Sequence, residues 1–131
     1  MAIATDIALE TMTEAFNARD LDTIAEVLAH DVVLRAPGFD CEGKDACLEF
    51  YGRWLDDFED AHLEAHDVHV LDDVIVEEGM FTGKHYGAAA TGRSVAFEYV
   101  QVLRTRGDKY SSVSVRFDRL AVLEQLGLLP E

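Results

Sequence analysis

Two polar side chains in the C-terminal half of the chain have the type and the position to act on a small molecule. Gln101 interrupts an alternating apolar pattern, and an unpaired amide on a buried face would cost about 1–3 kcal/mol. A ligand carbonyl could pair with this amide, and so could Tyr51, Tyr99 or a buried water. His85 is the second candidate, because an imidazole with an ordinary pKa of ~6.5 moves protons near neutral pH. The alternative for His85 is a structural or surface histidine.

The remaining histidines and the cysteines do not have metal-ligand spacing. His62, His66 and His69 fall in a segment with strand periodicity. There the first two would share a face about 13 Å apart at ~3.3 Å per residue, too far to hold one ion. Cys41 and Cys47 are the only cysteines, and their spacing fits neither a zinc site nor a disulfide scaffold. We therefore predict no metal, no cofactor and two free thiols.

The net charge of the chain limits the classes of partner that it can bind. The 131 residues carry 26 acidic and 11 basic side chains, a formal net charge of −15, which repels nucleic acids and anionic lipid surfaces. The hydrophobic content of 49% fits one domain over residues 1–131. No apolar run approaches the ~20 residues of a membrane span, and the N-terminus lacks a signal-peptide pattern. We expect a cytoplasmic protein with neither nucleic acid nor membrane partners.

Three helices are predicted in the first half of the chain. Apolar residues at steps of three and four predict a first helix that ends near Ala18. Asp20 can cap a second helix that stops near residues 30–31. After Gly43 the chain has its strongest helical period, carried by Cys47, Phe50, Tyr51, Trp54, Leu55 and Phe58.

The second half of the chain has strand periodicity. A first short strand, near residues 32–34, ends at Pro37 and Gly38, and a loop leads from there to Gly43. Further strands are expected near residues 62–70, 74–86, 94–104 and 109–117, and a last helix within 117–127. Three helices followed by consecutive antiparallel strands indicate an α+β domain whose curved sheet packs its concave face on the helices.

The strand expected at 94–104 is apolar on both faces. One face carries Gln101 among hydrophobic side chains, and the other carries Ala96, Val100 and Val102 beside Glu98. A sheet with two apolar faces does not leave one of them in water. We therefore predict a homodimer that forms through the outer face of the sheet.

Five short motifs follow one another along the chain: Phe16-Asn17-Ala18-Arg19-Asp20-Leu21-Asp22, Thr82-Gly83-Lys84-His85-Tyr86-Gly87, Thr91-Gly92-Arg93-Ser94-Val95, Phe117-Asp118-Arg119-Leu120 and Gln125-Leu126-Gly127-Leu128-Leu129-Pro130. Together they resemble one family, the SnoaL-like polyketide cyclases. These belong to the nuclear transport factor 2-like superfamily, and the resemblance covers nearly the whole chain. It implies a cone-shaped α+β barrel of three N-terminal helices and a curved antiparallel sheet around a deep apolar pocket.

The resemblance also shows which catalytic groups are replaced. The acid/base pair of the cyclases falls at Gln101 and Val115, and neither side chain titrates. Epoxide hydrolases of the superfamily also place a carboxylate at the position of Val115, and ketosteroid isomerases place their base nearest Ala36. One isomerase feature matches, since Glu49-Phe50-Tyr51 resembles the segment whose tyrosine joins the hydrogen-bond network of the pocket.

These implications lead to two hypotheses. The first is a cofactor-free enzyme that abstracts a proton next to a carbonyl of an apolar, polyketide-like substrate, which then cyclises, isomerises or dehydrates. His85 would be the base, and Tyr51, Tyr99 and Gln101 would stabilise the developing oxyanion. The alternative is a non-catalytic protein that binds such a molecule, which the empty acid/base positions favour. In both cases the expected substrate-binding residues are Tyr99, Trp54, Phe97, Val113 and Val115.

Overall fold

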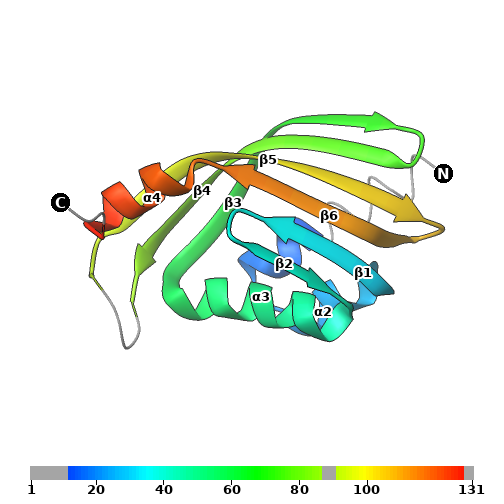
Figure 1. The fold of residues 1–131 in the computed structure, drawn as a ribbon, viewed down its shortest axis with the longest axis horizontal. Coiled ribbons are helices and arrows are strands. Elements are labelled where there is room, and N and C mark those ends of the chain that lie inside the picture. The colour runs from blue at the N-terminus through cyan, green and yellow to red at the C-terminus, as the bar shows by residue number, and fades with distance from the viewer. Residues whose placement is uncertain (1–11, 87–90, 129–131) are drawn as a thin grey trace.

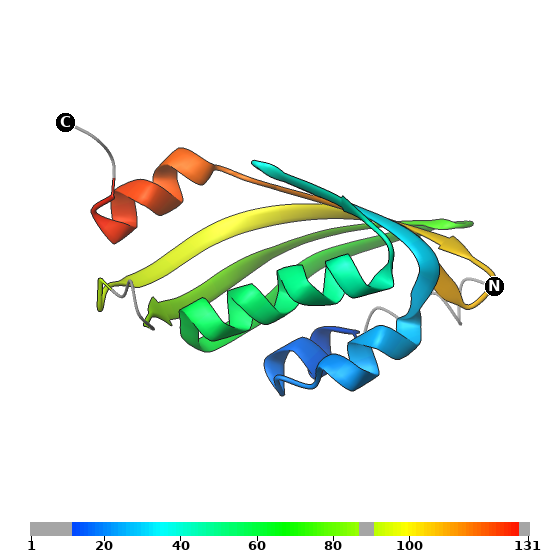
Figure 2. The same ribbon diagram turned by 60° about the horizontal axis from the view of Figure 1, so that its bottom comes forward.

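The fold is a curved six-stranded sheet whose concave face covers the N-terminal helices, while the C-terminal helix lies at one end of the sheet (Figure 1 and Figure 2). The computed structural model describes residues 12–86 and 91–128. Residues 12–17 are helical, and the further helices are α2 (Leu21–Val27), α3 (Lys44–Asp57) and α4 (Arg119–Leu126). The strands are β1 (Leu28–Ala36), β2 (Phe39–Glu42), β3 (Phe58–Leu71), β4 (Val74–His85), β5 (Ser94–Arg106) and β6 (Lys109–Phe117). Their order in the sheet is β2-β1-β6-β5-β4-β3.

Helix α2 begins where the sequence predicts and ends earlier. The carboxylate of Asp20 accepts a hydrogen bond from the backbone N–H of Thr23 at 3.2 Å, which confirms the predicted cap. The predicted end near residues 30–31 is wrong, because the chain enters β1 at Leu28. Leu28 is fully buried and pairs with Tyr110 of β6. Packing against a distant strand therefore overrides the local helical pattern.

Helix α3 confirms the strongest helical prediction and carries one wall of the site. It follows Gly43, whose φ of 94° is accessible to glycine at low cost. Its buried residues Cys47, Tyr51 and Leu55 recur every four positions, and this stripe packs beneath the concave face of the sheet. Tyr51 and Trp54 are held between the helix and the strands.

Two features of the sheet differ from the sequence-based expectation. Residues 39–42 form β2, whereas a loop was expected there, because the two-residue turn at Pro37 and Gly38 folds them back onto β1. Strands β1 and β6 pair in parallel, with Leu34 opposite Val113, so the sheet is not antiparallel throughout. The long intervening chain supplies the crossover that a parallel pair requires.

Strand β5 separates an inner face from an outer face. The inner residues are all buried: Val95, Phe97, Tyr99, Gln101 and Leu103. On the outer face, Glu98 is exposed and Val100 is 36% exposed. The predicted alternation is confirmed, and the homodimer through the outer face stays a prediction.

Helix α4 closes one end of the sheet. Asp118 caps it by accepting a hydrogen bond from the N–H of Ala121 at 3.0 Å. The side chain of Gln125 pairs with the backbone of Ala96 on β5, donating to its carbonyl at 3.0 Å and accepting from its N–H at 2.8 Å. The predicted last helix is therefore confirmed. Within residues 12–86 and 91–128, no helix is long and apolar enough to cross a membrane.

Candidate functional site

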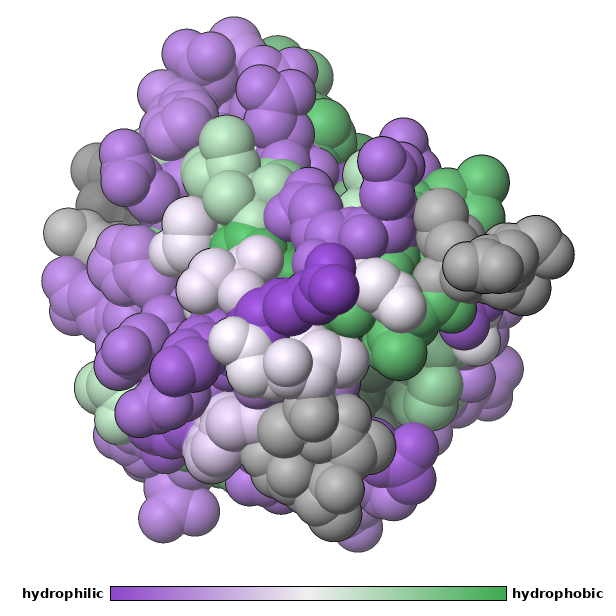
Figure 3. All heavy atoms as spheres, turned by 90° about the vertical axis from the view of Figure 1, so that its left-hand side faces the viewer, coloured by the Kyte–Doolittle hydropathy of each residue, from purple (hydrophilic) through white to green (hydrophobic). Residues whose placement is uncertain are grey.

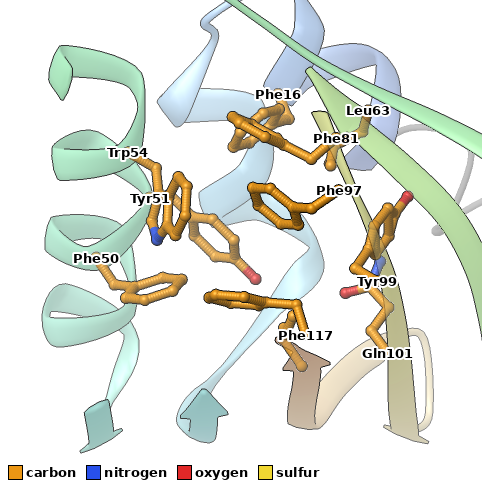
Figure 4. A pocket seen from close by; sticks show the side chains of 11 residues that line it. Phe16, Phe50, Tyr51, Trp54, Leu63, Phe81, Phe97, Tyr99, Gln101 and Phe117 are labelled. Atoms are coloured by element: carbon orange, nitrogen blue, oxygen red, sulfur yellow. The ribbon is translucent and has the colours of Figure 1, made fainter. Parts of the chain in front are cut away.

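A cavity of about 70 Å³ lies between α3 and the concave face of the sheet (Figure 4). Some of its wall residues, such as Trp54 and Leu63, are only half-buried. The face that carries α4 has a hollow with hydrophobic side chains among polar ones (Figure 3). The residues that line the cavity are Phe16, Phe50, Tyr51, Trp54, Leu63, Phe81, Phe97, Tyr99, Gln101, Val115 and Phe117.

The walls of the cavity are mainly aromatic. The ring of Trp54 lies 5.2 Å from that of Phe81 and 5.8 Å from that of Phe117, both nearly edge-on. The rings of Phe97 and Phe117 lie 5.0 Å apart. Such walls favour a flat, apolar ligand, because aromatic rings stack face to edge or offset at these distances.

The size of the cavity limits what fits without movement. Its volume of about 70 Å³ is roughly half that of an engineered cavity of about 150 Å³ that binds benzene. A ligand with one ring must therefore extend beyond the cavity or displace an aromatic side chain. Trp54 is the only tryptophan, so such a displacement would change the fluorescence of the protein.

The hydroxyl of Tyr51 is the polar group of the helical wall. It is buried, and it has no hydrogen-bond partner within the described part of the chain. Figure 4 shows this hydroxyl pointing from α3 into the space between the aromatic rings. Burial is the main cause that raises the pKa of Tyr51, so the phenol remains protonated at neutral pH and can donate a hydrogen bond.

The polar groups of the sheet wall are paired with one another. Glu77 on β4 is completely buried and lies opposite Gln101 of β5 in the register of the sheet. One carboxylate oxygen accepts from the hydroxyl of Tyr99 at 2.9 Å, and the other accepts from Nε2 of Gln101. Burial and the nearby Glu77 carboxylate both raise the pKa of Tyr99.

A glycine makes room for this network. A Cβ on Gly79 would lie 2.6 Å from the hydroxyl oxygen of Tyr99 and 2.5 Å from the backbone oxygen of Glu64. Both distances are too short for any side chain. Gly79 therefore allows the ring of Tyr99, its cross-strand partner, to lie across β4 and reach Glu77.

The structure brings most of the predicted site residues together. Six of them line the cavity: Tyr51, Trp54, Phe97, Tyr99, Gln101 and Val115. Val113 does not, because its fully buried side chain is part of the hydrophobic core. The protein partner of Gln101 also differs from those considered in the sequence analysis, since its Nε2 donates to Glu77 and not to Tyr51 or Tyr99.

His85 is not among the residues that line the cavity. It ends β4, where its ring lies 5.5 Å from that of Phe58. Its Nδ1 accepts a hydrogen bond from the backbone N–H of Thr91 at 3.1 Å, so the lone pair of that nitrogen is occupied. The arrangement does not place His85 as a base for a ligand in the cavity.

Sequence reasoning missed Glu77, although a signal was present. In β4 the period-two pattern places Glu77 on the same face as Ile75 and Phe81. A carboxylate on a buried face needs donors close by, and Tyr99 and Gln101 follow on the neighbouring strand. In the described ranges, no group of three or more histidine, cysteine or acidic side chains could hold a metal ion.

Solved structures with the same fold have diverse functions. A protein described as a SnoaL-like polyketide cyclase from Jannaschia sp. CCS1 superposes with a TM-score of 0.87 at 15% identity, covering 98% of this chain and 94% of that one. An epoxide hydrolase from M. tuberculosis gives 0.76 at 18% identity, covering 91% and 86%. TerC, which was crystallised with polyporic acid, gives 0.82 at 18% identity, covering 95% and 98%. At these identities the similarity establishes the fold alone.

Comparison of the sequence itself gives the family. No curated protein matches the chain significantly. The family model of the SnoaL-like domain matches residues 9–113, which include α2, α3 and the strands β1 to β5. The chain therefore belongs to the SnoaL-like domain family, with the cone-shaped fold of the nuclear transport factor 2-like proteins.

Proposed function

We propose that the protein is a cofactor-free enzyme that binds an apolar, polyketide-like carbonyl compound and stabilises its enolate. The unpartnered, buried hydroxyl of Tyr51 inside an aromatic cavity carries this proposal. A substrate carbonyl would accept a hydrogen bond from Tyr51, and that bond would strengthen as the α-proton leaves and negative charge develops on the oxygen. The enolate would then cyclise, isomerise or lose water.

The site residues have distinct roles in this proposal. Tyr51 is the catalytic donor, and the aromatic rings of Trp54 and Phe97 hold the substrate. Gln101 contacts the substrate from the sheet wall, and Val115 fills the position of a carboxylate in the cyclases. No carboxylate or imidazole of the described residues lines the cavity, so water at the open side accepts the proton.

A second candidate function is binding without catalysis. The observation that favours it is the same lack of a carboxylate or imidazole in the cavity wall. A protein that only stores or presents an apolar ligand needs the aromatic walls and the hydrogen bond from Tyr51, and it needs no base. The two candidates differ in one measurable property, the exchange of the protons next to the carbonyl.

Deuterium exchange distinguishes the two candidates. The protein is incubated in deuterated buffer with a panel of 1,3-dicarbonyl compounds and enones, and NMR follows both line broadening and loss of the C–H signals. The enzyme proposal predicts accelerated exchange that falls at least tenfold in Tyr51→Phe. Broadening without exchange would support the binding protein, and exchange that is unchanged in Tyr51→Phe would contradict the role of Tyr51.

The role of His85 is tested in the same experiment. Because its ring lies outside the cavity lining, we expect His85→Ala to leave the exchange rate within twofold of the wild-type value. Loss of exchange in this variant would restore His85 as the base.

We also propose that the protein works as a cytoplasmic homodimer that forms through the outer face of β5. The neighbouring Val100 and Val102 on this face support the proposal, since apolar side chains that gather on a charged surface are suited to an interface. Light scattering after size exclusion should give a dimer for the wild type at micromolar concentration and a monomer for Val100→Lys. A monomeric wild type would contradict it.

A further inference from the structure

We infer that Glu77, which lies outside the cavity, fixes the amide of Gln101 so that the cavity presents a hydrogen-bond acceptor to its ligand. The ligand must then carry an O–H or N–H group at the sheet wall. This inference rests on the proposed function only in assuming that a small molecule enters the cavity. Glu77 is thus a positioning residue, because it acts through Gln101.

The chemistry of a carboxylate determines the orientation of the amide. Both carboxylate oxygens of Glu77 act as acceptors in the structure, whereas an amide has a donor end and an acceptor end. Glu77 is completely buried, so no water competes for its oxygens. The amide therefore gives Nε2 to Glu77, as the structure shows, and the reverse orientation would place two acceptors against each other.

Tyr99, which lies beside Gln101, is the second donor to the Glu77 carboxylate. Tyr99 donates to one oxygen of Glu77 and one N–H of Gln101 donates to the other, so the Tyr99 hydroxyl and that N–H are already used. No lysine, arginine or histidine within the described ranges forms an ion pair with Glu77. These two neutral donors hold the carboxylate in place, and the carboxylate in turn holds them.

Figure 4 shows how the amide of Gln101 is oriented relative to the cavity. The nitrogen of Gln101 and the hydroxyl of Tyr99 lie on the side away from the aromatic rings, while the oxygen of Gln101 faces the cavity. On the opposite wall, Tyr51 offers an unpartnered hydroxyl. The ligand that fits both walls carries a donor for Gln101 and an oxygen acceptor for Tyr51, joined by a flat apolar body.

The orientation of the amide can be measured without a ligand. The sequence contains only Gln101, Gln125 and Asn17 as side-chain amides, so an NMR spectrum of a ¹⁵N-labelled sample shows three NH₂ pairs. We expect the NH₂ protons of Gln101 to exchange with solvent at least tenfold more slowly than those of Gln125. In Glu77→Gln, which keeps the shape of the side chain, this protection should fall at least tenfold.

Gln125 is the matched control. Its amide is paired at both ends with the backbone of Ala96, but it lies on α4 and forms none of the hydrogen bonds of Glu77. Its signals should not change in Glu77→Gln. A wild-type Gln101 that exchanges as fast as Gln125 would overturn the inference, and this measurement stands even if Glu77→Gln fails to fold.

Two probes of similar size test the consequence for ligand selection. Phenol carries a donor, and fluorobenzene replaces it with a fluorine that donates nothing. Their Kd values are measured by NMR titration. Because the two probes bury the same ring, the ratio of these values reports mainly on the donor. We expect the preference for phenol to fall at least fivefold in Glu77→Gln, because the released amide can turn its NH₂ group towards the cavity.

The outcomes separate the inference from the proposed function. If both probes bind and their ratio does not change in Glu77→Gln, the role of Glu77 is wrong, while the cavity remains a ligand site. If neither probe binds, the proposed function is contradicted, and the amide exchange experiment still decides the orientation of Gln101.

Discussion

The two walls of the cavity each carry a buried tyrosine, and the two phenols differ in whether their hydroxyl has a hydrogen-bond partner. Tyr99 on β5 donates to Glu77 at 2.9 Å, whereas the hydroxyl of Tyr51 on α3 has no partner within the described residues. The hydroxyl of the sheet wall therefore has a partner within the protein, whereas the hydroxyl of the helical wall has none among the described residues and can donate to a ligand. A buried polar group left unpaired costs about 1–3 kcal/mol, so the two walls make different contributions to stability and to binding.

The largest expected effect comes from removing the donors of the sheet wall. The double variant Tyr99→Phe/Gln101→Leu leaves Glu77 buried with no hydrogen bond, and we expect the free energy of unfolding to fall by about 3–5 kcal/mol. Urea unfolding at pH 7 measures this loss. Adding Glu77→Met removes the buried charge, so the triple variant should recover most of the stability. A double variant as stable as the wild type would show that the Glu77 network does not hold the sheet wall together.

A smaller loss is expected from filling the space that Tyr99 occupies. The Cβ of Gly79→Ala would lie 2.6 Å from the Tyr99 hydroxyl oxygen and 2.5 Å from the backbone oxygen of Glu64. Since the backbone of β3 cannot move away easily, the ring must shift from Glu77, and we expect a loss of about 1–3 kcal/mol.

Gly52→Ala is the control for this substitution. Gly52 lies inside α3, where the nearest atom to its Cβ position is 3.6 Å away, an ordinary contact. Alanine favours a helix interior over glycine, so this variant should gain about 0.5–1 kcal/mol. If both glycine variants change stability by the same amount, the close approach at Gly79 has no energetic consequence.

The stability of the protein at high pH should reveal the burial of Tyr51 on the helical wall. Burial raises the pKa of Tyr51 above that of an unfolded tyrosine, so its contribution to stability is full below about pH 10 and is lost as the pH rises further. At pH 11 this loss is about 1.4 kcal/mol for one such group. Tyr51→Phe should therefore weaken the dependence of stability on pH between 9 and 11 by that amount.

Other groups also affect the stability in this pH range, and their contributions cancel when Tyr51→Phe is compared with the wild type. Burial raises the pKa of Cys47 to about 12, and Tyr99 also has a raised pKa. Both remain in Tyr51→Phe, so the difference between the two proteins reports on Tyr51. Identical pH profiles from urea unfolding at pH 9, 10 and 11 would show that Tyr51 is not desolvated.

The parts of the fold that were predicted correctly are those with local signals. The helical period of α3, the cap at Asp20 and the alternation of β5 each depend on neighbouring residues. The early end of α2 at Val27 and the parallel pairing of β1 with β6 depend on Tyr110 and its strand, about 80 residues away. A local pattern carries no information on such a partner.

The site was predicted in part for the same reason. Tyr51, Trp54, Phe97 and Gln101 line the cavity, and the period of the helix or strand that carries each of them already indicates which residues share its face. Glu77 was missed, since its role depends on the register that places it opposite Gln101. His85 matched a family motif and yet lies outside the cavity lining, where it bonds to Thr91. A motif identifies the strand, and the cross-strand register determines what its side chains touch.

Apart from the glycine control, the smallest expected effect is a gain in stability, and it comes from a direct comparison of the two phenols. Tyr51→Phe removes a buried hydroxyl that has no partner within the described residues, so the free energy of unfolding should rise by about 1 kcal/mol. Tyr99→Phe is the same chemical change, but it takes a donor from Glu77 and should lower that free energy by about 1.5–3 kcal/mol. Urea unfolding of both variants at pH 7 measures the two signs. A loss of stability in Tyr51→Phe would mean that the hydroxyl is already satisfied in the free protein, and the helical wall would then not be reserved for a ligand.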